Sequence, residues 1–250
     1  QYFPDFDYFE NVIKKAIKQI KSTGGHIFIG DVKNYDYIKE FSGAMNDKDE
    51  EKELFISPMQ FYLLQMKYSE IAYVEVLLKN GLYNNELSKY RYDVVLHIKE
   101  KLDFFECSEL NYINWEKIKS SIFQNMNNSL VIEHVPLEQL QGENRNSNNT
   151  LLEKILSMKQ ECTVKCIYTP EEQDCTILIL KEKSDKVLQV YGDTFLEEFI
   201  PKLQVVNLIN TPFYNLRKYK LEENIRKSLL RVLPSYMVPS CIDIVKSIPL

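Results

Sequence analysis

Polar side chains that could orient a nucleophile stand immediately before one apolar run of the chain. Residues 85–98 read NELSKYRYDVVLHI, so an amide, a carboxylate and a guanidinium (Asn85, Glu86 and Arg91) precede the segment VVLHI. A carboxylate or an amide can hold an amine by hydrogen bonds, and an α-amine, whose pKa is about 7.7 to 8.0, needs no strong base to lose its proton. We therefore predict that Asn85 and Glu86 orient a nucleophile such as an amine.

The same residues also fit a structural explanation. Asn85 and Glu86 could form a turn, with Glu86 paired to Arg91 across the loop. Tyr90 and Tyr92 could simply pack, because alternate aromatic side chains are common where a strand begins. At the level of the sequence both explanations stay open.

A helix, a glycine turn and a short strand precede this region. Apolar residues recur at helical spacing, namely Phe9, Val12, Ile13, Ala16, Ile17 and Ile20. Asp7 and Glu10 have capping-box spacing near the start, and the two glycines at 24–25 end the helix. The segment HIFI at 26–29 predicts a buried strand, which Gly-Asp at 30–31 should end. This succession is the repeat unit of an α/β sheet.

Helix and strand patterns continue along the chain. Residues 73–78 and 93–98 predict two antiparallel strands joined by a fairly long loop. The other predicted strands are 163–168 and 175–180. Helices are predicted to start at Ser57-Pro58, to span 151–158, and to run from Leu221 to a stop at Pro234. In the segment 117–140 we predict a helix from Lys117 that is followed by VIEHVPLEQL.

Three stretches of the chain resemble one known protein family. They are QYFP at 1–4, GGHIFIGDV at 24–32 and the stretch at 85–98. Together they are similar to the second half of the methyltransferase domain that is embedded in the adenylation domain of nonribosomal peptide synthetases. A fourth stretch, LRVLPSYMVPSCIDIVKSIPL at 230–250, looks like the final adenylation segment and follows in the expected order.

This resemblance implies a partial class I, Rossmann-like α/β methyltransferase sheet with a C-terminal antiparallel strand pair, plus a small α+β segment. Residues 1–212 would be the C-terminal part of an S-adenosylmethionine-dependent methyltransferase domain. Residues 213–250 would be a partial C-terminal subdomain of an adenylation (AMP-binding) domain, with the joint at 210–212. The parent enzyme would activate an amino acid and N-methylate the aminoacyl thioester on a carrier domain.

The resemblance also implies roles for individual residues. The implied catalytic residues are Glu86, Asn85, Arg91 and Tyr2. Gln1 and Asp31 would lie near the cofactor, because both follow strands at the edge where ligands collect in a doubly wound sheet. Gln1 and Tyr2 belong to the family's SVAQYFP motif, whose first three residues the chain lacks. Asp31 could instead hold a backbone turn.

The implied cofactors are shared with the rest of a synthetase. Only seven glycines occur, and none forms a glycine-rich loop between a strand and a helix, so the main S-adenosylmethionine loop is expected upstream of Gln1. ATP and Mg²⁺ would serve the parent adenylation domain, whose lysine segment is expected beyond Leu250. The implied partners are the peptidyl carrier domain with its phosphopantetheine, other domains of the same synthetase and the aminoacyl thioester substrate.

Bulk composition narrows the remaining functions. A net charge of −5 over 250 residues predicts no nucleic-acid partner. No run of about 18 apolar residues and no basic, apolar leader occurs, so no membrane anchor is expected. Five cysteines without CxxC spacing fit a reduced cytoplasmic compartment, and neither they nor the three histidines predict a metal site or a catalytic triad.

Two other functions stay open. The retained residues do not name the acceptor atom, so the chain could belong to a C- or O-methyltransferase segment of a related megasynthase. It could also be a non-catalytic relic that docks against a neighbouring domain. An intact glycine-rich loop after an upstream strand would favour a working cofactor site over the docking relic.

Overall fold

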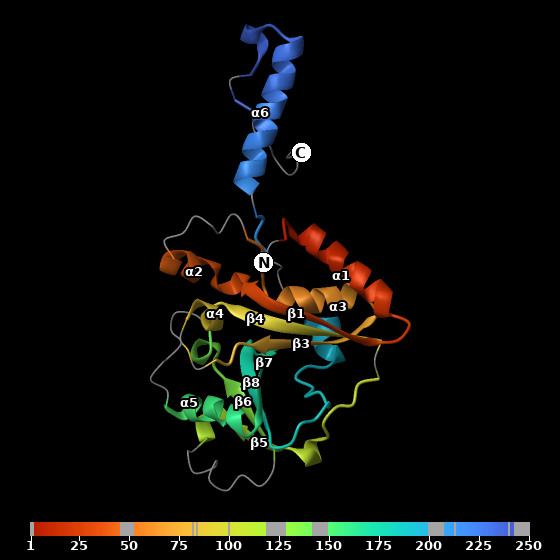
Figure 1. Cartoon of the computed structure of the whole chain (residues 1–250), viewed down its shortest axis with the longest axis vertical. Coiled ribbons are helices and arrows are strands. Elements are labelled where there is room, and N and C mark those ends of the chain that lie inside the picture. The colour runs from red at the N-terminus through yellow and green to blue at the C-terminus, as the bar shows by residue number, and fades with distance from the viewer. Residues whose placement is uncertain are drawn as a thin grey trace.

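One sheet runs through the part of the chain that the computed structural model describes, which is residues 3–45, 53–81, 83, 85–99, 101–118, 129–141, 150–199, 208–212, 214–239 and 241–242. Its eight strands lie in the order β2-β1-β4-β3-β7-β8-β6-β5 (Figure 1). The strands are β1 Gly25–Asn34, β2 Phe55–Ile56, β3 Ile71–Leu78, β4 Arg91–Ile98, β5 Asn111–Asn114, β6 Leu130–Val135, β7 Thr163–Thr169 and β8 Asp174–Leu180. The α-helices are α1 Phe6–Ile20, α2 Ile38–Met45, α3 Met59–Lys67, α4 Glu86–Lys89, α5 Thr150–Ser157 and α6 Tyr214–Val232.

The predicted strand pair is confirmed. β3 and β4 are antiparallel, and β4 also runs antiparallel to β1, so that it lies between two strands that share one direction. The pairs β1–β2 and β5–β6 are parallel, and the other neighbours are antiparallel. The protein therefore has the predicted α/β class, and its mixed sheet is consistent with a fragment of a Rossmann-like methyltransferase fold.

Helix α1 covers one face of this sheet together with α3 (Figure 1). It begins three residues before Phe9 and is capped by Asp5, whose side chain accepts a hydrogen bond from the Tyr8 N–H at 2.8 Å, rather than by Asp7. Its apolar face is buried, and the Phe9 ring meets the edge of Phe61 in α3. Each such buried side chain stabilises the fold by roughly 1.5 to 3 kcal/mol.

Strand β1 differs from its prediction in length and in burial. It continues beyond residues 30–31 as far as Asn34, through an irregularity in its pairing with β4 between Ile29 and Val32. The strand was predicted to be buried, yet Phe28 is 65% exposed. The reason is that exposure alternates along residues 25–31, so Phe28 lies on the face of β1 that no helix of the described residues covers. Residues 25–31 also pair with β4 alone, since β2 meets β1 only at Lys33 and Asn34 within the described residues.

The second half of the sheet contains elements that were predicted and one strand that was not. The helix at 151–158 and the two strands after it are confirmed as α5, β7 and β8. In the segment 117–140 a helix followed by VIEHVPLEQL was predicted, and Leu130–Val135, in the part after that helix, forms strand β6, which was not predicted. Residues 119–128 lie outside the described residues. The sequence LVIEHV is rich in β-branched side chains, and both neighbours in the sheet supply hydrogen-bond partners for it.

Helix α6 stands apart from the sheet and forms an arm at one end of the molecule (Figure 1). It starts at Tyr214, earlier than the apolar pattern from Leu221 predicted, and it ends at Val232, two residues before Pro234. Large apolar side chains on this arm, such as Val232 at 80% exposure, are open to solvent. None of the helices in the described ranges has the combination of length and apolar composition needed to cross a membrane.

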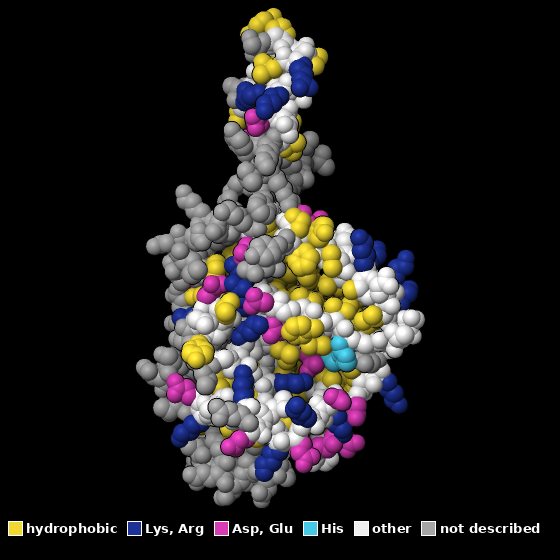
Figure 2. Space-filling model, in the orientation of Figure 1, with side chains coloured by type: hydrophobic (Ala, Val, Ile, Leu, Met, Phe, Trp, Pro, Cys, Tyr) yellow, Lys and Arg dark blue, Asp and Glu magenta, His cyan; other side chains and the backbone are white. Residues whose placement is uncertain are grey.

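Hydrophobic side chains also gather on the visible surface of the body, over the region of α1 and α3, as Figure 2 shows. The exposed apolar residues of these two helices are Tyr8, Val12 and Met66. On the other face of β1, Phe28 and its cross-strand partner Val95 are not fully covered. The first strands are thus packed against helices on one face only, within the described residues.

Candidate functional site

Charged side chains meet at the edge where β1 and β3 end and where β4 begins. Asp31 lies at the irregularity in β1, three residues before the strand ends, Lys79 directly follows β3, and Arg91 and Asp93 lie at the start of β4. Because β1 and β3 run in the same direction, this is the carboxyl edge for both of them. In open α/β sheets, ligands bind outside the carboxyl ends of the strands.

Arg91 joins two of the predicted site residues. One guanidinium nitrogen lies 2.5 Å from the Asp31 carboxylate, and the other donates to the Glu86 carboxylate. The Arg91 side chain is only 7% exposed, whereas those of Asp31 and Glu86 are 45% and 27% exposed. Burial by itself would lower the pKa of Arg91, but the Glu86 hydrogen bond and the Asp31 charge outweigh it and raise that pKa. Arg91 is therefore a fixed cation that holds two partly exposed carboxylates.

Asp93 and Lys79 complete this charged edge. The Asp93 carboxylate accepts a hydrogen bond from the backbone N–H of Asp31 at 2.7 Å and pairs with Lys79 Nζ at 2.6 Å. Lys79 Nζ also lies 3.9 Å from Asp31 Oδ1. Asp31 has a φ of 64°, in the left-handed region that an aspartate adopts more readily than most residues. Asp31 thus holds a local backbone bend through its contact with Asp93, while its carboxylate is partly exposed at the edge; its role towards a cofactor stays a prediction.

Asn85 lies beside this group but has a capping role. Its side-chain oxygen accepts a hydrogen bond from Ser88 N–H at 3.1 Å, and its own N–H donates to the Ser88 hydroxyl at 3.2 Å. This reciprocal arrangement is a capping box at the start of α4. The loop between the strands, predicted to have no regular structure, therefore contains one short helix, and Glu86 is its first residue.

Tyr90 and Tyr92 pack in the interior, as the structural explanation anticipated. Tyr90 meets the edge of the Phe41 ring, and the buried Tyr92 hydroxyl donates to the Ile56 carbonyl at 2.6 Å. Gln1 and Tyr2, the other two predicted site residues, lie outside the described residues. The structure therefore brings together Asp31, Asn85, Glu86 and Arg91 from that prediction.

Sequence reasoning missed several residues that build this edge. Lys79 could have been found, because it directly follows a predicted strand at the same edge. Asn34 and Gln141 could not, because their link depends on the tertiary fold: Asn34 Nδ2 donates to Gln141 Oε1 at 3.1 Å, and Gln141 Nε2 donates to the Arg91 carbonyl at 2.9 Å. This buried amide chain fixes the backbone from which Arg91 projects.

The charged edge can act as an acceptor of hydrogen bonds. It combines three carboxylates, from Asp31, Glu86 and Asp93, with two cations, from Arg91 and Lys79. The two partly exposed carboxylates retain acceptor capacity, which suits an amine or a hydroxyl group of a bound molecule. These side chains could contact the polar groups of a cofactor such as S-adenosylmethionine. They supply only part of a cofactor site, because no glycine-rich strand-to-helix loop occurs among the described residues.

Comparisons with known proteins point to one kind of enzyme. The chain is 36% identical over 117 residues to chondramide synthase cmdD of Chondromyces crocatus. This match covers 39% of this chain and 3% of that protein. Over the whole chain it is 24% identical to cyclosporin synthetase simA of Tolypocladium inflatum, 2% of which is covered, and 25% identical to nonribosomal peptide synthetase asqK of Emericella nidulans, 12% of which is covered. No family model matches the chain.

The chain therefore spans a small part of the length of these relatives. Matches that extend over the whole chain include a cyclosporin synthetase and two proteins named nonribosomal peptide synthetases. Similarity to segments of several such proteins supports an origin of this chain in a nonribosomal peptide synthetase.

Proposed function

We propose that the chain is the second half of an S-adenosylmethionine-dependent methyltransferase domain, over residues 1–212, followed by the start of an adenylation C-terminal subdomain, over 213–250. Its parent synthetase would activate an amino acid and N-methylate the aminoacyl thioester. The observation that carries this proposal is the charged edge, where Asp31, Glu86 and Arg91 meet at the carboxyl ends of β1 and β3. The similarity to segments of nonribosomal peptide synthetases supports it.

The incomplete covering of β1 also supports the proposal. Residues 25–31 have a hydrogen-bonded neighbour strand on one side only, within the described residues, and Phe28 is 65% exposed. An apolar strand of this kind is normally paired on both sides in a parallel α/β sheet. Further strands of a methyltransferase sheet would pair with this edge, and the helices that connect such strands would cover its exposed apolar face.

In the proposed reaction S-adenosylmethionine supplies a methyl group that already has a good leaving group, so the protein chiefly positions the acceptor. Glu86 would orient the amine of the aminoacyl group by a hydrogen bond. Arg91, 7% exposed, would position both Glu86 and Asp31. Asp31, with Gln1, would contact the cofactor, and Tyr2 and Asn85 would line the transfer site.

The other proposed ligands and partners belong to the parent enzyme. ATP and Mg²⁺ would serve amino-acid activation, and the aminoacyl group would arrive on the phosphopantetheine of a peptidyl carrier domain. Residues 213–250 would contact other domains of the same synthetase, and the exposed apolar side chains of α6, such as Leu230 and Val232, suit such contacts. A cytoplasmic location is part of the proposal.

One observation favours a second function. Both Asp31 and Glu86 already pair with Arg91, and Asn85 is used as a helix cap, so the loop has a structural role without any ligand. A non-catalytic docking segment would need no more than this. The docking alternative and the methyltransferase proposal differ in the effect of removing the Glu86 charge from the complete synthetase.

The test is Glu86→Gln in the complete synthetase. If Glu86 orients the acceptor, methylated product should fall by about 10- to 100-fold, which corresponds to the loss of one hydrogen bond to a charged group. Adenylation of the amino acid should stay unchanged, because that reaction uses a different pocket. Normal methylation by the variant would assign the loop to the structural role.

A matched variant separates chemistry from folding. Glu161→Gln makes the same chemical change at an exposed position outside the charged edge. It should leave both methylation and adenylation at the wild-type rate. Equal losses in both glutamate variants would show that the assay reports general damage rather than a function of Glu86.

A further inference from the structure

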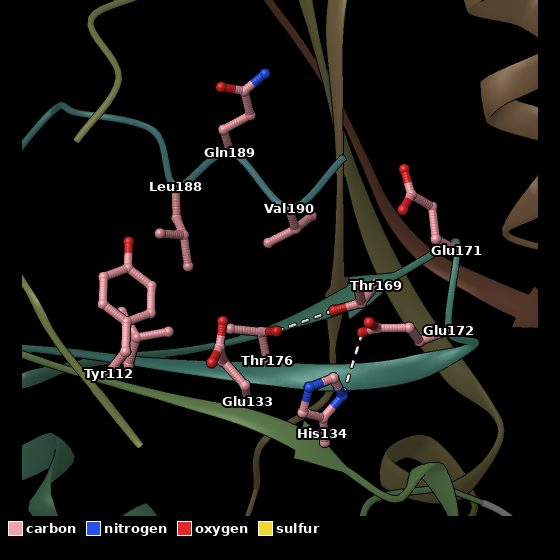
Figure 3. Close-up of a pocket in the computed structure, with 11 residues that line it drawn as sticks. Tyr112, Glu133, His134, Thr169, Glu171, Glu172, Thr176, Leu188, Gln189 and Val190 are labelled. Atoms are coloured by element: carbon pink, nitrogen blue, oxygen red, sulfur yellow. Dashed lines mark hydrogen bonds and ion pairs between the residues drawn. The ribbon is translucent and has the colours of Figure 1, made fainter. Parts of the chain in front are cut away.

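A separate pocket of about 180 Å³ opens beside β6 and the β7–β8 turn, as Figure 3 shows. It shares none of its lining residues with the charged edge described above. Glutamates at 133, 171 and 172 line it together with His134. No lysine or arginine occurs among its described lining residues, so the pocket favours a cation over an anion.

Three side chains converge on one point at the rim of this pocket. His134 Nδ1 lies 3.0 Å from Asp174 Oδ2 and 3.3 Å from Glu172 Oε2. One donor atom from each of the three residues lies within 4.8 Å of the other two. Figure 3 shows the His134 ring directed towards Glu172. One nitrogen and two carboxylate oxygens can therefore reach a common ligand.

The backbone holds these donors on neighbouring strands. His134 lies in β6 where its pairing with β8 shifts, between Ile132 and Val135. Asp174 is the first residue of β8, and Glu172 precedes it in the turn that joins β7 to β8. Because β6 and β8 are hydrogen-bonded to each other, the backbone holds His134 close to Asp174, and Glu172 joins them from the turn.

We propose that His134, Glu172 and Asp174 form a binding site for a divalent transition-metal ion of the Zn²⁺ type. Zinc takes imidazole nitrogen and carboxylate oxygen, and sites with three protein ligands leave a fourth position for water or another molecule. The imidazole favours a transition metal over Mg²⁺ or Ca²⁺, which prefer oxygen ligands alone. Glu133 and Glu171, which line the same pocket, add negative charge around the site. The ion would also tie the β7–β8 turn to β6.

The experiment titrates ZnCl₂ into the purified, metal-free 250-residue protein by calorimetry and follows thermal unfolding. One equivalent should bind, and at about 100 times the dissociation constant the midpoint of unfolding should rise by roughly 5 to 10 °C. Exposed Cys107 and Cys241 are replaced by serine in every sample, because thiolates also bind zinc. Co²⁺ then reports the ligands, since the proposed site gives a spectrum without a thiolate charge-transfer band.

His134→Asn and Asp174→Asn are the decisive variants. Asparagine suits position 134, where φ is 58°, because it tolerates the left-handed region. Each variant should bind Zn²⁺ at least about 10-fold more weakly. His26→Asn, at an exposed histidine on β1, should bind like the wild type.

Three results would overturn the proposal. The first is no binding by the wild-type protein, which would reduce the cluster to an ion pair around a protonated imidazole. The second is binding that both site variants retain, and the third is a thiolate band that shows cysteine ligation. None of these results bears on the charged edge, so methylation in the complete synthetase is tested independently.

Discussion

Arg91 links the two partly exposed carboxylates of the charged edge. Its buried guanidinium contacts Asp31 at the irregularity in β1 and Glu86 in the first turn of α4. The alternative interpretation of the sequence, in which Glu86 pairs with Arg91, describes this contact correctly. The same contact also leaves parts of both carboxylates exposed, so it is compatible with a role in positioning a ligand.

Replacing Arg91 by alanine should destabilise the folded protein by about 2 to 3 kcal/mol. The reason is that two carboxylates lose their shared cation, although their partial exposure to solvent reduces the cost. Urea unfolding of Arg91→Ala and of the control Lys15→Ala, at an exposed position of α1, measures the difference. A loss no larger than that of the control would mean that Arg91 does not organise the charged edge.

At the scale of elements, residues whose local pattern agrees with their tertiary surroundings were predicted well. The helix before Gly24, the strand pair and the β7–β8 hairpin combine clear periodicity with turn residues. Strand β6 was missed because the segment 117–140 lacks such signals and because its strand state depends on the two neighbours β5 and β8. The cap at Asp5 was missed because Asp7 and Glu10 also have capping-box spacing.

The turn between α1 and β1 contains two glycines with positive φ, Gly24 and Gly25, and Gly24 is the more crowded of the two. Gly24 has a φ of 73°, and an added Cβ would lie 3.3 Å from the Ile98 carbonyl oxygen. Gly24→Ala should therefore cost about 1 to 2 kcal/mol of unfolding free energy. Gly81→Ala is the matched control, because a Cβ there would meet nothing within 4 Å. Equal stability of the two variants would contradict this account of the turn.

A buried ion cluster joins strands β3, β4 and β7 and should make the sheet sensitive to acid. Glu75 Oε2 lies 2.9 Å from His97 Nε2, and Glu75 Oε1 lies 3.6 Å from Lys165 Nζ. Burial by itself would raise the pKa of Glu75, but the His97 hydrogen bond and the Lys165 charge outweigh it and lower that pKa from 4.5. Because the folded pKa is depressed, this stabilisation is present above about pH 4.5 and is lost as the pH falls through the folded value.

Glu75→Gln should therefore lower the free energy of unfolding by about 1.5 to 3 kcal/mol at pH 7. The difference from the wild type should shrink as the pH falls below about 4.5, because the carboxylate then becomes protonated in the unfolded protein and, at lower pH, in the folded protein as well. Urea unfolding between pH 3 and pH 7, with Glu161→Gln as an exposed control, measures this. A difference in unfolding free energy that is constant with pH would show that the charge of Glu75 does not contribute to stability.

At the scale of the whole molecule, the exposed parts of the sheet are those that lack a covering helix or a neighbouring strand. The sheet is closed by helices on one face of β1, while the edge of residues 25–31 and the exposed Phe28 remain open within the described residues. The α/β class and the strand pair could be predicted from the sequence, because both depend on local periodicity. The amide chain from Asn34 through Gln141 to Arg91 and the cluster at His134 could not, because distant segments build them.

The most direct test of the proposed methyltransferase identity is calorimetric titration with S-adenosylmethionine. It compares the 250-residue chain with the complete synthetase module that contains it. We predict one micromolar site in the module and no measurable binding by the chain alone, because the charged edge supplies only part of a cofactor site. Micromolar binding by the isolated chain would contradict the proposed division of the domain. No binding by the complete module would contradict the methyltransferase identity itself.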